Sequence, residues 1–90
     1  MRARDTTEDH ATLALRALVW TLAEPRRALR LLDTTGLTPA DLRSRVSDPA
    51  VLVAALGFLQ AHQPDLIECA SGIGVSPDRL IAAHEALAAT

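Results

Sequence analysis

Five prolines divide the chain into segments of helical length: Pro25, Pro39, Pro49, Pro64 and Pro77. Each of them opens a stretch whose apolar residues recur at the spacing of a helix face. Proline is favoured in the first turn of a helix, because its missing N–H would have no partner there and its ring sets a helical φ. No run alternates apolar and polar residues as a strand would. The sequence therefore predicts an all-α fold of six short helices, at about residues 7–23, 25–34, 39–46, 49–62, 64–71 and 77–88.

The residues beside these prolines are typical of helix ends. Good N-cap residues come directly before three of the prolines: Thr38, Asp48 and Ser76. Residues 38–41 have the form of a capping box, with Asp in place of the usual Glu. Gly36 and Gly74 follow helical segments, where a left-handed residue favours the end of a helix. The short connections that remain predict a compact bundle.

A chain of 90 residues is about the length of one domain. We expect residues 1–6 to form a loose tail and residues 7–90 to form a single helical domain. Two segments are apolar nearly all round: residues 13–20, which carry one charge at Arg16, and residues 51–59, which carry none. A helix that is apolar on both sides is central to a domain or shared with a partner, so these two helices should lie side by side at the centre.

The two central segments belong to a longer internal similarity at an offset of 38 residues. It predicts two pseudo-repeated three-helix halves, residues 7–46 and 48–88, that close on a shared core. The alternative is that helix caps and stop glycines recur in both halves for purely local reasons. The matching segments are Leu13–Leu15 with Val51–Val53, Trp20 with Phe58, and Gly36–Pro39 with Gly74–Pro77.

The order of these motifs resembles a known family. Ala-Leu-x-x-Leu is followed by Gly-Leu-Thr-Pro-x-x-Leu, then by Asp-Pro-Ala and a second copy that ends in Gly-Val-Ser-Pro. Over about residues 11–88 the chain is similar to a small alphaproteobacterial family known only as a domain of unknown function. The resemblance implies no activity, and it implies no site residues.

Charge and hydropathy argue against several classes of protein. Residues 1–45 carry a net charge of +2 and residues 46–90 carry −4, which is not the basic field of a nucleic-acid-binding protein. The longest stretch without a formal charge, residues 49–64, is shorter than the roughly 18–20 residues of a membrane span. The early apolar run is interrupted by Arg16, unlike a secretory signal. We therefore expect a cytoplasmic protein without a membrane segment.

The residues that carry most enzyme chemistry are few and scattered. His10, His62, Cys69 and His84 do not form the close pairs of a structural zinc site. The lone Cys69 cannot close an intramolecular disulfide and is expected to be a small buried apolar residue. There is no glycine-rich phosphate loop. The sequence predicts a protein that is not an enzyme and that holds no metal and no cofactor.

Residues 64–88 resemble a helix-turn-helix DNA-binding unit. Ala70 would let the two helices approach, Gly74 would make the turn, and Leu80 would pack beneath the second helix. Against this function, the second helix begins with Asp78 and Arg79, and a single Arg beside acidic residues is a poor phosphate contact. DNA binding through this unit is the alternative to the function favoured below.

Three arginines, Arg26, Arg27 and Arg30, form a second cluster with two interpretations. They are candidates for an anion or RNA contact. They also fit a solvated helix face on which Arg30 interacts with Asp33 three residues later. No lysine and few aromatic residues accompany them, which disfavours RNA.

The first central helix carries more apolar surface than one core face needs. Leu13 and Trp20 lie on the side of the helix opposite a stripe formed by Leu15, Leu18, Val19 and Leu22. If Trp20 packs on Phe58, the monomer is self-sufficient; if Trp20 is exposed, Leu13 and Trp20 are candidate partner-binding residues. We favour the packing of Trp20 on Phe58. The function predicted is a non-catalytic protein-interaction or adaptor module that binds another protein or forms a homodimer.

Overall fold

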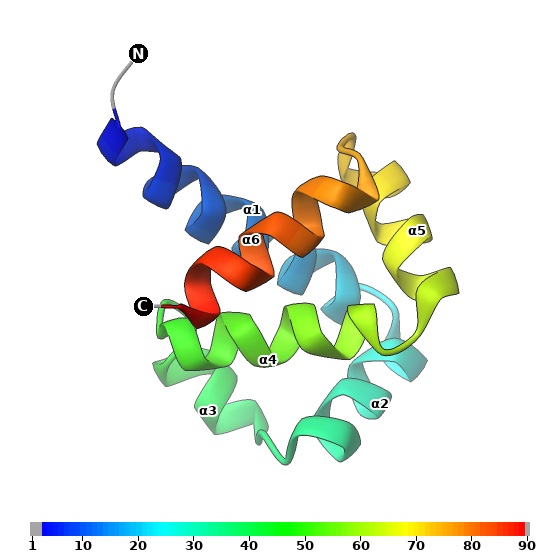
Figure 1. The fold of residues 1–90 in the computed structure, drawn as a ribbon. Helices are drawn as coiled ribbons and strands as arrows, with labels where there is room; N and C mark the ends of the chain where they lie inside the picture. Colours follow the sequence, from blue (N-terminus) through cyan, green and yellow to red (C-terminus); the bar gives the residue numbers. More distant parts are fainter. Residues whose placement is uncertain (1–2, 90) are drawn as a thin grey trace.

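The computed structural model describes the backbone of residues 3–89 and the side chains of residues 10–89. Within this range the chain forms six α-helices and no strand, so the predicted all-α fold is confirmed (Figure 1). The helices are α1 (Ala3–Leu22), α2 (Pro25–Thr35), α3 (Pro39–Ser44), α4 (Pro49–Gln60), α5 (Gln63–Ile73) and α6 (Pro77–Ala88).

Most helix boundaries fall within two residues of the prediction, and α6 has the predicted bounds. The largest difference is at α1, which begins at Ala3, so that residues 3–6 are helical where a loose tail was predicted. Nothing between Ala3 and Leu22 interrupts a helix, because that stretch holds neither glycine nor proline. Residues 1–2 of the predicted tail lie outside the described part of the chain.

The predicted helix caps are present. The Thr38 Oγ1 accepts the Asp41 N–H at 3.0 Å and the Asp41 Oδ2 accepts the Thr38 N–H at 3.0 Å, which completes the capping box. Gly36 and Gly74 end α2 and α5 in the left-handed region, at φ 77° and φ 80°. Glu24 supplies a cap that the sequence did not reveal, since its Oε1 accepts the Arg27 N–H at 2.9 Å.

The two central helices, α1 and α4, pack against each other, as predicted. In Figure 1, α4 crosses the middle of the molecule, with α6 above it and α2 and α3 below it. Helix α6 packs on both α1 and α4, and α2 and α5 also contact both of them. The core is aliphatic apart from Phe58 and Cys69. Helix α2 contributes only Leu31 to the buried residues and α3 contributes none.

Within residues 3–89, no single helix has both the length and the apolar character needed to cross a membrane. Helices α4 and α5 meet both criteria only when they are taken together, and they are bent by 114° at the break between them.

Candidate interaction surface

The first predicted partner-binding residue, Leu13, lies inside the molecule. Its side chain is 4% exposed and belongs to the hydrophobic core. The prediction that Leu13 contacts a partner is therefore wrong. The physical reason is that α1 turns toward the core the face that holds Leu13 and Leu18, so its surplus apolar surface lies elsewhere on the helix.

The second predicted residue, Trp20, is half-buried and packs against the core. The guanidinium carbon of Arg27 lies 3.6 Å from the centre of the indole ring, which is cation–π distance. The indole also lies against α5 at Gly72, where an added Cβ would come within 2.7 Å of the Trp20 Nε1. Trp20 is thus held between α2 and α5 within the chain. Its packing on Phe58 stays a prediction.

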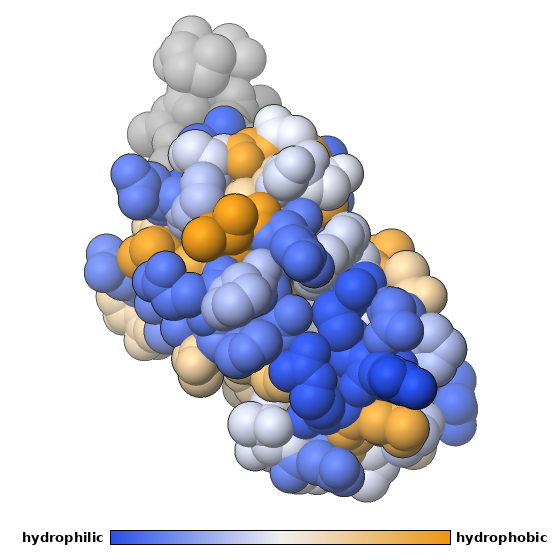
Figure 2. Space-filling model, turned by 90° about the vertical axis from the view of Figure 1, so that its right-hand side faces the viewer, coloured by the Kyte–Doolittle hydropathy of each residue, from blue (hydrophilic) through white to orange (hydrophobic). Residues whose placement is uncertain are grey.

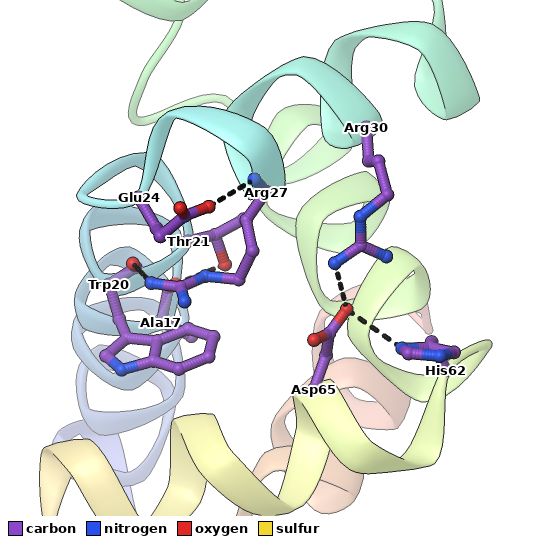
Figure 3. Close-up of polar contacts among 8 residues, drawn as sticks. All are labelled: Ala17, Trp20, Thr21, Glu24, Arg27, Arg30, His62 and Asp65. Atoms are coloured by element: carbon purple, nitrogen blue, oxygen red, sulfur yellow. Dashed lines mark hydrogen bonds and ion pairs between the residues drawn. The ribbon is translucent and has the colours of Figure 1, made fainter.

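Arg27 joins the end of α1 to the start of α2. Its Nη2 donates to the carbonyl oxygen of Trp20 at 2.8 Å, as Figure 3 shows. That carbonyl is one of the last in α1, and a cation there also complements the helix dipole. The Arg27 Nε is buried and has no hydrogen-bond partner. The side chain therefore acts within the protein as a brace between two helices.

Arg30 forms an ion pair with a residue far along the chain. Its Nη2 donates to the Asp65 Oδ2 at 2.8 Å, and the Nδ1 of His62 lies 3.0 Å from the same oxygen (Figure 3). Asp65 is only 6% exposed. Burial would raise the pKa of Asp65, but the hydrogen bonds from Arg30 and His62 outweigh burial and lower that pKa below its ordinary value. The predicted partner of Arg30 was Asp33, so the true partner lies on α5 instead of on the same helix.

The three arginines proposed as an anion contact therefore do not form one free cluster. Arg26 is exposed, whereas the guanidinium groups of Arg27 and Arg30 are engaged by the Trp20 carbonyl and by Asp65. An incoming anion at Arg30 would have to compete with a buried carboxylate. This geometry fits a structural role for two of the three residues.

The exposed apolar surface of α1 is formed by other residues. Leu15 is 37% exposed and Val19 is 61% exposed, and Thr12 is exposed one turn earlier. We call Thr12, Leu15 and Val19 the α1 outer face. It adjoins an open hollow of about 140 Å³. The hollow is lined by Ala11, Thr12 and Leu15 of α1, by Val46 and Ser47 before α4, and by Leu52 of α4.

Elsewhere the large exposed apolar residues stand singly on their helices. Leu29 of α2 is 62% exposed and Ile67 of α5 is 52% exposed. On the face drawn in Figure 2, apolar residues form small separate patches among hydrophilic ones. Scattered apolar residues of this kind are ordinary on a protein surface. The α1 outer face differs because its apolar residues adjoin a hollow.

The groups that could support catalysis are buried or separate. Among the described residues, no three His, Cys, Asp or Glu side chains are placed to hold a metal ion. Cys69 is fully buried, and burial raises the pKa of its thiol to about 11. A thiol with this pKa stays protonated at neutral pH and is a weak nucleophile. His84 is half-buried beside α4, where an added Cβ at Gly57 would lie 3.5 Å from its Nε2.

The proposed helix-turn-helix unit has the expected turn. The N–H of Val75 donates to the Ala70 carbonyl at 2.9 Å across the left-handed Gly74, and α5 and α6 contact each other. The exposed residues of α6 include Asp78, Arg79 and Glu85. Two acids against one arginine give this face no attraction for phosphate.

Comparison with known proteins places the chain in one family. The matching family is described as a protein of unknown function, DUF3572, and the match covers residues 7–90. Neither the curated proteins nor the solved structures gave a significant match. The match spans the whole helical bundle. The chain therefore belongs to the DUF3572 family of proteins of unknown function.

Proposed function

We propose that this protein is a non-catalytic protein-interaction module, and that the α1 outer face and the adjoining hollow are its contact surface. The observation that carries the proposal is the exposure of Val19, which is 61%, beside the partly exposed Leu15. Burying an aliphatic side chain of this kind against a partner contributes about 1.5–3 kcal/mol when the burial is complete.

The surroundings of the two residues support the same function. Leu15 forms part of the wall of the hollow, and the hydroxyl residues Thr12 and Ser47 lie at the same site. Apolar contacts with a few polar groups around them are typical of protein–protein interfaces. The partner is another protein or a second copy of this chain.

A photo-crosslinking amino acid placed at position 19 of the full chain, in native cells, tests the proposal. Position 67 is a matched control, because Ile67 is also an exposed aliphatic residue, at 52%. We expect a specific covalent adduct from position 19 and none from position 67. The adduct should disappear when Leu15→Glu is added. Equal labelling from both positions, or none from position 19, would contradict the proposal.

The alternative function is DNA binding through residues 64–88. The left-handed turn at Gly74 and the contact between α5 and α6 favour it. Filter binding to random duplex DNA at low salt tests it, because non-specific affinity is electrostatic and is greatest there. Binding that is weakened by Arg79→Ala would support this alternative, and absence of binding at low salt would eliminate it.

A further inference from the structure

The two halves of the chain can be compared position by position at the offset of 38 residues. In this comparison α1 corresponds to α4, α2 to α5 and α3 to α6. Helix α2 contacts both α1 and α4, and α5 contacts both α4 and α1, so these contacts match. The helix ends match as well, since Gly36 and Gly74 are both left-handed and Thr38 and Ser76 both cap the helix that follows.

The third helices of the two halves differ in length and in what they cover. Helix α6 has 12 residues, packs on α1 and α4, and buries Leu80, Ala83 and Leu87. Helix α3 stops after 6 residues at Ser44 and buries none. It makes no helix–helix contact of comparable extent in the described part of the chain. The first half therefore lacks a counterpart for the second half of α6.

The surface left open by the short α3 is the α1 outer face. His84 of α6 lies over α4 at Gly57, where an added Cβ would be 3.5 Å from its Nε2. The residue of α1 that corresponds to Gly57 is Val19, which is 61% exposed. Val46, which corresponds to His84, instead lines the hollow beside Leu15. One half thus shows a helix over the surface that stands open in the other half.

We propose that the α1 outer face and the hollow bind an amphipathic helix of a partner protein, which lies where a longer α3 would lie. This inference rests on the proposed function and specifies its partner. Helices that dock in this way present apolar residues at the spacing i, i+3 or i+4, i+7, which Leu80, His84 and Leu87 of α6 also follow.

The side chain on α1 sets the size of the residue that faces it. Where α4 has Gly57 opposite His84, α1 has the larger Val19. The partner helix therefore needs a small residue, such as alanine, at its central contact position. Helix α6 of a second copy does not fit this site, because its Leu80 and Ala83 are fully buried in its own core.

A designed helical peptide tests the inference on the full chain. The probe is a fluorescein-labelled peptide of about 14 residues, rich in Ala, Glu and Lys, with Leu, Ala and Leu at positions i, i+4 and i+7. Fluorescence anisotropy measures its affinity, and a peptide with Asp in place of both leucines is the control. We expect binding that is at least about tenfold weaker for Val19→Arg. Ile67→Arg, a charge introduced at a comparably exposed position, should leave the affinity unchanged.

The size argument has its own test. A second probe carries His in place of the central Ala. We expect it to bind the wild-type chain more weakly than the first probe does, and to regain affinity with Val19→Ala. Amide shifts in NMR spectra should move at Leu15, Val46 and Leu52. Shifts confined to α4 and α6, or no binding of the first probe at about 1 mM, would overturn the inference.

The outcomes separate this inference from the proposed function. An adduct from position 19 in cells, together with failure of the peptide, would leave the function standing and reject the helical partner. Loss of both would reject both. A dimer in light scattering that becomes a monomer with Val19→Arg would assign the surface to a second copy and overturn the inference of a separate helix.

Discussion

The Arg27 side chain contacts Trp20 twice: its guanidinium carbon lies 3.6 Å from the centre of the indole ring, and its Nη2 donates to the Trp20 carbonyl oxygen at 2.8 Å. One side chain thus covers a half-buried ring and also satisfies a carbonyl at the end of α1. Because α2 contributes only Leu31 to the buried residues, polar contacts of this kind have a large share in fixing α2 to the bundle.

Arg27→Ala should lower the free energy of unfolding by about 2–3 kcal/mol, since it removes a cation–π contact and a charged hydrogen bond to a carbonyl. Urea denaturation followed by circular dichroism measures the loss. The control is Arg26→Ala, which removes an exposed neighbouring arginine and should change stability by less than about 0.5 kcal/mol. Equal losses for the two variants would contradict the bracing role of Arg27.

Gly72 and Gly57 should respond to alanine in opposite ways. A Cβ at Gly72 would come within 2.7 Å of the Trp20 Nε1, so the indole ring must move and Gly72→Ala should destabilise the fold by about 1–3 kcal/mol. A Cβ at Gly57 would lie 3.5 Å from the His84 Nε2, an ordinary contact. Gly57→Ala should therefore stabilise helix α4 by about 0.5–1 kcal/mol. The emission of the single tryptophan should shift only in Gly72→Ala, and a stabilised Gly72→Ala would count against the close contact.

The Arg30–Asp65 pair predicts a dependence of stability on acid. The pKa of Asp65 is lower in the folded protein than the ordinary value of 3.8. Its contribution is therefore complete above the unfolded pKa and is lost as pH falls through the folded pKa. Asp65→Asn should lower the free energy of unfolding at pH 7 by about 1–3 kcal/mol. The difference from wild type should shrink as the pH falls below the ordinary pKa.

Denaturation curves at several pH values test this prediction. Asp33→Asn is the control, because Asp33 is exposed and Arg30 pairs with Asp65 instead. A difference between wild type and Asp65→Asn that stays constant down to the lowest pH would show that the ion pair does not contribute.

Cys69 should react with iodoacetamide only when the chain opens. Its thiol is fully buried and has a pKa of about 11, so both access and ionisation limit the reaction at neutral pH. We expect labelling, followed by mass spectrometry, to be at least about 100-fold slower in the native protein than in urea. Comparable rates in the two conditions would mean that this part of the core opens readily.

The local sequence was sufficient to predict where the helices begin and end. Caps such as Thr38 and stop residues such as Gly74 act through hydrogen bonds that span only a few positions, so they are visible without knowledge of the fold. The position of α1 beside α4 followed from their apolar character on all sides.

The same apolar character hid which face of α1 points inward. A helix that is apolar all round has no polar face to mark the solvent, so the sequence did not separate the buried Leu13 from the exposed Val19. Only the packing of α4, α5 and α6 against α1 decided between them.

The partner of Arg30 shows the same division. Spacing along one helix suggested Asp33, because residues three apart share a helix face. The actual partner, Asp65, is 35 residues away and is brought close by the packing of α2 and α5 around the central helices. By itself the sequence determined the helices and their caps, since those interactions are local. The tertiary structure alone decided which side chains are buried, paired or open to a partner, because these depend on contacts between segments that are distant in the chain.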